Sequence, residues 1–231
     1  MTTISDRLLQ AQQRIELAAK KSNREAGEIT LLAVSKTKPI SQIEAAYQAG
    51  QRKFGENYVQ EGVDKITQMQ TQYPDIEWHF IGPLQSNKSK LIAEHFDWMH
   101  TLDRDKIAQR LASQRPSGMA PLNVCIQVNI SQEQSKSGIA IDDIEQLADK
   151  ISQMPQLNLR GLMAIPTATD DLTIQQHECQ QLNNAFLKLK QRYPMLDTLS
   201  IGMSNDLEIA IANGSTMVRI GSAIFGARDY Q

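Results

Sequence analysis

The stretch Ile29-Thr-Leu-Leu-Ala-Val-Ser-Lys36 is an apolar run that ends on a single lysine. Side chains alternate between the two faces of a strand, so Leu32, Val34 and Lys36 share one face. Both faces are mostly apolar, which is typical of a strand in a parallel sheet that is covered on both sides. Because Thr37-Lys38-Pro39 ends the strand and starts a loop, we expect Lys36 where a buried strand emerges.

Lys36 has two interpretations. A partly desolvated lysine has a lowered pKa, and its neutral amine can attack a carbonyl group to form a Schiff base. Alternatively, the side chain only carries its charge out of the strand end into water. This stretch alone leaves both interpretations open, and residues near the other end of the chain favour the first.

Strand and helix patterns alternate from residue 29 onward. Strand patterns lie at residues 29–35, 52–57, 77–82, 98–103, 122–130, 159–165, 198–202 and 217–221. Helical patterns lie between them, near residues 41–49, 57–72, 86–95, 104–115, 141–153, 173–192 and 204–213. Ser204 is expected to cap the last of these helices, and Asn213-Gly214 to end it.

This alternation predicts an α/β protein with a (β/α)8 TIM barrel, because a chain of 231 residues suits one such barrel. We expect residues 1–231 to form a single domain. Residues 3–22 form an extra amphipathic N-terminal helix, which should pack on the barrel exterior or close its bottom. An open doubly wound sheet is the alternative, but it would normally bring a glycine-rich first turn, which residues 35–39 do not form.

Composition excludes several classes of protein. The 24 basic and 26 acidic residues give a net charge of −2 with no basic block, so nucleic acid is not an expected partner. No apolar run approaches the length of a membrane span, and the N-terminus lacks an apolar signal core, which favours a cytoplasmic protein. Cys125 and Cys179 read as reduced core residues, and the 4 histidines show no metal-binding spacing.

The loops after the seventh and eighth strand patterns suit a phosphate group, which barrels of this kind commonly bind there. Glycine lets the backbone approach an anion, and serine hydroxyls add hydrogen-bond donors. The candidate residues in these two loops are Ser200, Gly202, Ser204, Arg219, Gly221 and Ser222.

The alternative is that Ser204 only caps a helix and that the glycines only form turns. Asp206 supports it, since an acid in the first helical turn repels an anion. The occurrence of both loops at the expected pair of strands favours phosphate instead. Lys36 lies beside the eighth strand once a barrel closes, and an amine next to a phosphate site suits pyridoxal phosphate.

Several long motifs carry a resemblance to a known family. They are LLAVSKTKP at 31–39, FGENYVQE at 54–61, WHFIGPLQSNK at 78–88, SKSGI at 135–139, RGLMAIP at 160–166, LSIGMSNDLEIAI at 199–211 and MVRIGSAIFGARDY at 217–230. With them the chain resembles the pyridoxal phosphate homeostasis protein (YggS/PROSC) family from about residue 29 onward. That family is similar to the N-terminal barrel of fold-type III enzymes such as alanine racemase.

The resemblance implies that Lys36 binds pyridoxal 5′-phosphate as a Schiff base and that the loop serines and glycines surround its phosphate. Arg219 would face the pyridine nitrogen, and because arginine cannot accept a proton, the cofactor would be a weak electron sink. Asn57, His79 and Met163 would contact the ring. His79 is equally well read as a hydrogen-bonded interior histidine.

Three functions follow from these interpretations. The first is a monomeric protein that holds pyridoxal phosphate, takes part in vitamin B6 homeostasis and delivers the cofactor transiently to apo-enzymes. The second is a pyridoxal-phosphate-dependent racemase of a small amino acid. The third is a Schiff-base aldolase that acts on a sugar phosphate without a cofactor.

The resemblance to racemases also argues against racemase activity, because racemisation needs a base on each face of the substrate carbon. In those enzymes the base opposite the lysine is a tyrosine from a separate C-terminal domain of the partner subunit. This chain ends at Gln231, shortly after Gly221, and Tyr230 is the only tyrosine in that tail. We therefore expect no catalytic residues and little turnover.

Overall fold

The computed structural model describes residues 2–131, 133 and 136–227, so Tyr230 lies outside the described residues. Within this part of the chain, parallel strands β1 to β8 close into a barrel in sequence order. The strands are β1 (Thr30–Val34), β2 (Lys53–Glu56), β3 (Glu77–Phe80), β4 (Trp98–Leu102), β5 (Leu122–Gln127), β6 (Leu157–Met163), β7 (Thr198–Ser200) and β8 (Met217–Ile220). Each lies inside or overlaps one predicted strand, and the predicted barrel is confirmed.

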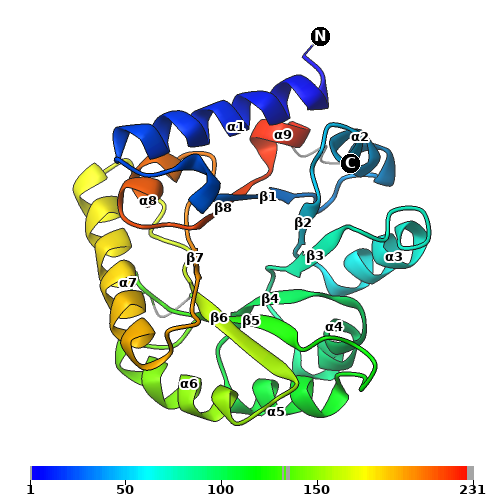
Figure 1. Cartoon of the computed structure of the whole chain (residues 1–231), viewed down its shortest axis with the longest axis vertical. Helices are drawn as coiled ribbons and strands as arrows, with labels where there is room; N and C mark the ends of the chain where they lie inside the picture. The colour runs from blue at the N-terminus through cyan, green and yellow to red at the C-terminus, as the bar shows by residue number, and fades with distance from the viewer. Residues whose placement is uncertain (1, 132, 134–135, 228–231) are drawn as a thin grey trace.

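The helices form a ring outside the strands (Figure 1). They are α1 (Ile4–Lys21), α2 (Ile40–Gln48), α3 (Val59–Met69), α4 (Ser89–His95), α5 (Asp105–Gln114), α6 (Ile144–Ser152), α7 (Leu172–Arg192), α8 (Leu207–Ala212) and α9 (Ser222–Phe225). The space between strands and helices holds the main hydrophobic core. Cys125 and Cys179 are both buried and not disulfide-bonded, as predicted.

Two small apolar clusters lie inside the barrel, which is packed with side chains in this fold. Leu32, Ile81 and Met217 form one cluster, with Val34 packed against it. Trp98, Cys125 and Met163 form the other. The face of β1 that carries Leu32 and Val34 therefore points into the barrel, as its alternation predicts for the face shared with Lys36.

Helix α1 packs on the barrel exterior, beside α8 and α9 (Figure 1). A capping box between Thr3 and Asp6 starts the helix. Arg14 on α1 forms an ion pair with Glu208 on α8 at 2.8 Å and donates to the carbonyl oxygen of Ser204 at 3.1 Å. Of the two positions expected for this helix, the structure shows the exterior one.

The expectation that Ser204 caps α8 is wrong. The helix begins at Leu207, with Asp206 at its N-cap. The Asp206 carboxylate accepts from the backbone N–H of Met203 at 2.6 Å, which closes a turn ahead of the helix and keeps residue 204 outside it. The expected end is confirmed, since Asn213 is the C-cap and Gly214 has φ 97°.

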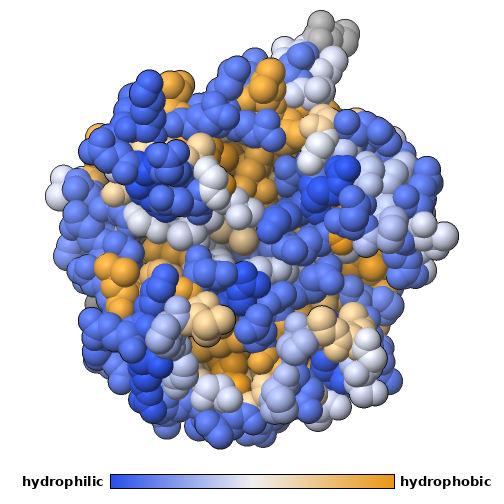
Figure 2. Space-filling view, viewed as in Figure 1, coloured by the Kyte–Doolittle hydropathy of each residue, from blue (hydrophilic) through white to orange (hydrophobic). Residues whose placement is uncertain are grey.

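The face of the molecule shown in Figure 2 is mainly polar. Hydrophilic side chains cover most of the face seen in Figure 2, and hydrophobic patches lie between them. Among the described residues, no helix combines the length and apolar character that a membrane span requires.

Gly161 on β6 marks a point where the barrel tolerates only glycine. Val124 pairs with Leu159 and Cys125 with Gly161, so Arg160 is an extra residue in β6 and forms a bulge. A Cβ atom at position 161 would lie 1.7 Å from the backbone oxygen of Thr198 on β7.

We expect Gly161→Ala to lower the free energy of unfolding by at least about 2 kcal/mol, because the backbone of β7 has to move. Urea unfolding followed by circular dichroism measures this change. Gly118→Ala is the control, since a Cβ there meets nothing within 4 Å. Equal stability of the two variants would contradict the packing described for β6 and β7.

Candidate functional site

A cavity of about 840 Å³ opens at the carboxyl ends of the strands. Its walls come from residues at or just after the ends of β1, β2, β3, β6 and β8 and from the loops that follow β1, β5, β6, β7 and β8. The predicted site residues that line it are Lys36, Asn57, Met163, Ser204, Arg219, Gly221 and Ser222. His79, Ser200 and Gly202 are buried and are not among the lining residues.

The backbone around Lys36 is held in a tight turn. Thr37 has φ 63°, a left-handed conformation that costs free energy in a β-branched residue. Its N–H donates to Glu61 Oε1 at 2.6 Å, and the N–H of Lys38 donates to the Ser35 carbonyl at 3.1 Å. These bonds fix the direction in which the chain leaves β1 on either side of Lys36.

A buried ion-pair cluster supports this turn from β2 and α3. Lys65 Nζ donates to Glu56 Oε1 at 2.8 Å, to Glu61 Oε1 at 2.7 Å and to the Ser35 carbonyl at 2.8 Å. Ser35 Oγ also donates to Glu56 Oε1, at 2.5 Å. Burial raises the pKa of Glu56, although the Lys65 charge acts in the opposite direction. The turn that carries Lys36 therefore rests on side chains that the sequence analysis did not single out.

Arg219 is a buried cation in the cavity wall, only 4% exposed. Its Nη1 donates to Ser200 Oγ at 2.7 Å, and its Nη2 donates to the Ala164 carbonyl at 3.0 Å. Burial lowers its pKa to about 10, so the guanidinium stays charged at neutral pH. No carboxylate among the described residues forms an ion pair with it, which is unusual for a buried charge.

The loops after β7 and β8 meet at the same cavity. Ser204 lines it beside Gly221 and Ser222, where α9 begins. Asp206 also lines the cavity, and its charge opposes the binding of an anion nearby. Gly202 serves the turn itself: it has φ 105°, and a Cβ there would lie 2.7 Å from Ala210 Cβ.

The rim of the cavity includes residues that the sequence analysis left without a role. Residues 165–170, which follow β6, line one side. Lys136 Nζ donates to Glu133 Oε1 at 2.9 Å and to the Pro166 carbonyl at 3.2 Å. Lys38 Nζ donates to the carbonyl oxygen of Ala227 at 2.7 Å. In the sequence, the only feature that marks these residues as candidates for the site is that they follow the end of a strand.

His79 is fully buried inside the barrel and bonded at both ring nitrogens. Its Nδ1 lies 2.8 Å from His100 Nε2, and its Nε2 lies 2.9 Å from Glu77 Oε1. Its ring stacks on Trp98 with centroids 5.0 Å apart. These contacts favour the interpretation as an interior histidine over a contact with a bound ring.

Ser200 joins this interior group to the cavity, since its Oγ lies 2.9 Å from His100 Nδ1 and also accepts from Arg219. The sequence analysis missed His100. The available signal was alternation: the third residue of β3 and the third residue of β4 are both histidines, and both face inward.

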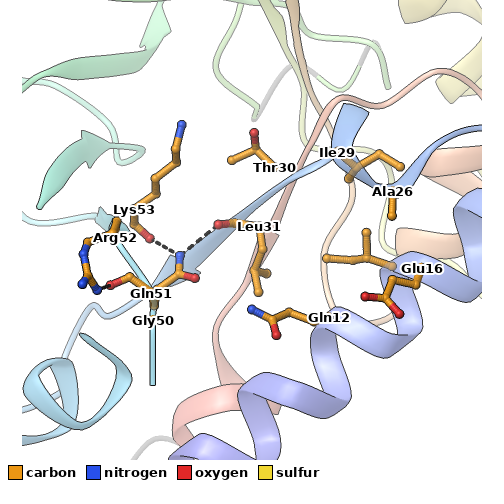
Figure 3. Close-up of a pocket in the computed structure, with 11 residues that line it drawn as sticks. Gln12, Glu16, Ala26, Ile29, Thr30, Leu31, Gly50, Gln51, Arg52 and Lys53 are labelled. Atoms are coloured by element: carbon orange, nitrogen blue, oxygen red, sulfur yellow. Dashed lines mark hydrogen bonds between the residues drawn. The ribbon is translucent and has the colours of Figure 1, made fainter. Parts of the chain in front are cut away.

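A second hollow, of about 360 Å³, lies where β1 and β2 begin, next to α1. Figure 3 shows the Gln51 amide between the carbonyl oxygens of Leu31 and Lys53, to which it donates at 2.9 and 2.7 Å. This polar side chain thus joins two strands. None of the predicted site residues lines the hollow, so the candidate site is the cavity at the carboxyl ends.

The two buried histidines, His79 and His100, should make the free energy of unfolding depend on pH. Burial lowers the pKa of His79 and lowers that of His100 well below the ordinary value of 6.5. His100 faces the charge of Arg219, whereas His79 faces Glu77, Lys53 and Arg160. Below pH 6.5 the unfolded chain binds protons that the folded chain does not.

The free energy of unfolding should therefore reach its full value above about pH 7. On acidification it should fall, by up to about 1.4 kcal/mol per pH unit for each histidine. Urea unfolding between pH 7.5 and 5.5 measures the slope. We expect a shallower slope for His100→Gln, and an unchanged one for His177→Gln, since His177 is exposed on α7. An unchanged slope in His100→Gln would contradict the assignment of a neutral buried His100.

Comparison with known proteins agrees with this architecture. The family model described as "Alanine racemase, N-terminal domain" matches residues 10–229. The alanine racemase of Corynebacterium glutamicum has a TM-score of 0.69 at 13% identity, over 95% of this chain and 61% of that chain, which shows a common fold.

Closer relatives match over nearly their whole length. The pyridoxal phosphate homeostasis protein of Escherichia coli strain K12 is 59% identical, over 100% of this chain and 99% of that protein. The structure of PipY from Synechococcus elongatus with PLP bound has a TM-score of 0.83 at 34% identity, over 97% of this chain and 100% of that chain. The chain therefore belongs to the pyridoxal phosphate homeostasis protein family, whose barrel is that of the alanine racemase N-terminal domain.

Proposed function

We propose that this chain binds pyridoxal 5′-phosphate in the cavity at the carboxyl ends of its strands and takes part in intracellular vitamin B6 homeostasis. The observation that carries the proposal is the buried Arg219 cation, which has no carboxylate partner among the described residues and shares a cavity with Lys36. Asp206 acts on Arg219 only through space, and a buried cation that no carboxylate contacts favours a ligand that brings negative charge or a lone pair. The names of the E. coli and Synechococcus relatives support the same ligand.

The lining residues fit this cofactor. The cavity has the size of a small-molecule site. Arg219 would donate to the pyridine nitrogen, and Asn57 and Met163 would contact the ring. Ser204, Gly221 and Ser222 would supply hydroxyl and backbone donors to the phosphate.

Lys36 would supply the covalent link. A lysine amine condenses with an aldehyde to form a C=N bond with release of water, and Lys36 would hold the cofactor in this way. In this interpretation, the ion-pair cluster around Lys65 serves to hold the turn that presents Lys36 to the cavity.

We further propose that the loaded protein carries the cofactor and has little catalytic activity. An arginine at the pyridine nitrogen keeps that nitrogen unprotonated and limits stabilisation of a carbanion. Among the described residues that line the cavity there is neither a tyrosine nor a histidine to serve as a second base. Lys136 and Lys38 are engaged with Glu133 and with backbone carbonyls. The receivers of the cofactor would be apo-enzymes that bind transiently to a cytoplasmic monomer.

Lys36→Ala tests the covalent link. The variant should fold normally, because its side chain lies at a strand end outside the core clusters. After incubation with pyridoxal 5′-phosphate, the wild type should turn yellow and retain a borohydride-reduced adduct at Lys36, as mapped by peptide mass spectrometry. Lys36→Ala should lose both signals while it keeps weaker, noncovalent binding.

Lys38→Ala is the matched control, since Lys38 lines the same cavity and its Nζ donates to the carbonyl oxygen of Ala227. It should stay yellow. A yellow, borohydride-trappable Lys36→Ala protein would refute the assignment of Lys36. A colourless wild type that instead forms an adduct with a sugar phosphate would favour the aldolase alternative.

Incubation of the loaded protein with L-alanine or L-serine in heavy water tests the second part of the proposal. We expect slow α-deuteration at most and no measurable loss of chirality, because the described residues that line the cavity include no tyrosine or histidine to act as a second base. Mass spectrometry and chiral chromatography follow the two outcomes. Turnover at ordinary enzyme rates, about 1–10³ per second, would make the protein a racemase.

A further inference from the structure

A hydrogen-bonded chain of side chains runs through the inside of the barrel and ends at Arg219. Arg219 on β8 contacts Ser200 on β7, which contacts His100 on β4, and His100 contacts His79 on β3. His79 contacts Glu77 at the start of β3. Three of the four links are 2.7 to 2.9 Å long between fully buried atoms, and the fourth reaches a half-buried carboxylate.

The end at Arg219 fixes one direction of donation. A guanidinium can only donate, so Ser200 Oγ accepts from Arg219 Nη1. The single hydroxyl hydrogen of Ser200 is then available to His100 Nδ1, which lies 2.9 Å away. A neutral His100 that accepts at Nδ1 carries its hydrogen on Nε2 and donates to His79 Nδ1.

The end at Glu77 fixes the same direction independently. Burial opposes ionisation of Glu77, but the hydrogen bond from His79 and the nearby Lys53 charge hold its pKa below the ordinary value. The carboxylate can only accept, so His79 donates from Nε2. A neutral His79 then has Nδ1 as its acceptor, which is what a donor at His100 Nε2 requires. One set of tautomers therefore satisfies every link.

We propose, on the basis of the proposed function, that Ser200, His100 and His79 are positioning residues. Their hydrogen bonds all donate in one direction, toward Glu77, and together they orient Arg219 toward the cofactor ring. The chain holds Nη1 through Ser200, while the Ala164 carbonyl holds Nη2. The guanidinium plane is thereby fixed before any ligand enters. Links that all donate in one direction also polarise one another, which strengthens each of them.

Nuclear magnetic resonance of histidine-labelled protein tests the chain without any cofactor. The ring nitrogen shifts should show His79 and His100 as neutral Nε2–H tautomers at pH 7, assigned through His79→Gln and His100→Gln. An Nδ1–H tautomer or a protonated ring at either position would overturn the inference. The tautomers can be measured even if the protein does not bind pyridoxal 5′-phosphate. Failure to bind would reject the proposed function but not the hydrogen-bonded chain.

Ser200→Ala tests the effect on Arg219, with Ser215→Ala as the matched control. Both serines are fully buried, but Ser215 donates only to backbone carbonyls. Both variants should lose similar stability. Only Ser200→Ala should weaken pyridoxal 5′-phosphate, by about tenfold, as expected for one hydrogen bond to a charged group. It should also shift the pH profile of the visible absorbance band, which a change in stability alone does not move.

The glutamine amide offers a rescue at position 100, because its oxygen accepts and its nitrogen donates in the same order as the histidine ring. His100→Gln should keep the affinity and the pH profile close to those of the wild type, and His100→Phe should resemble Ser200→Ala. If the wild type binds the cofactor and Ser200→Ala behaves like Ser215→Ala, the inference is refuted and the proposed function stands.

Discussion

The pairing of β1 with β8 is the interaction on which the rest of the structure depends. It joins segments from opposite ends of the sequence and closes the barrel, with Leu32 opposite Arg219. If β1 did not pair with β8, Lys36 and Arg219 would lie at opposite edges of an open sheet. With this pairing, the amine and the guanidinium share one cavity, and the loops after β7 and β8 stand beside them. Hydrogen bonding between two short strands thus creates the site.

Folding buries polar groups both between β2 and α3 and inside the barrel, and this burial is costly unless each group finds a partner. The protein meets this cost in two different ways. Lys65 pairs with Glu56 and Glu61, so a buried cation meets its counter-charge directly. Arg219 meets a serine hydroxyl and a backbone carbonyl, and the carboxylate of Glu77 acts only from a distance through neutral rings. The first arrangement suits a fixed support, and the second leaves a positive charge for a ligand.

The sequence was sufficient to predict the barrel, because local periodicity indicated its strands and every helix except the short α9. It also indicated Lys36 and Arg219, since position at a strand end and inward parity follow from residue number alone. The sequence did not show which inward-facing side chains touch one another. Alternation along a strand indicates that Ser200 and His79 face inward, but it does not identify their partners, which are His100, Arg219 and Glu77. The start of α8 was misjudged because the Asp206 carboxylate accepts from the N–H of Met203, three residues earlier, and closes a turn around Ser204. Contacts between distant segments, such as Lys65 with the turn at Ser35, leave no local pattern.

The contact of α1 with α8 and α9 has a consequence for how the chain folds. Leu8, Ala11 and Ile15 are synthesised well before α8 and α9, the helices that cover them. Until then, the apolar stripe of α1 and the unpaired edge of β1 remain exposed, and both are surfaces on which partly made chains aggregate. Contacts of such long sequence separation also slow the final step of folding. The pairing of β1 with β8, which assembles the site, therefore leaves the nascent chain prone to aggregation until β8 and the neighbouring helices have been synthesised.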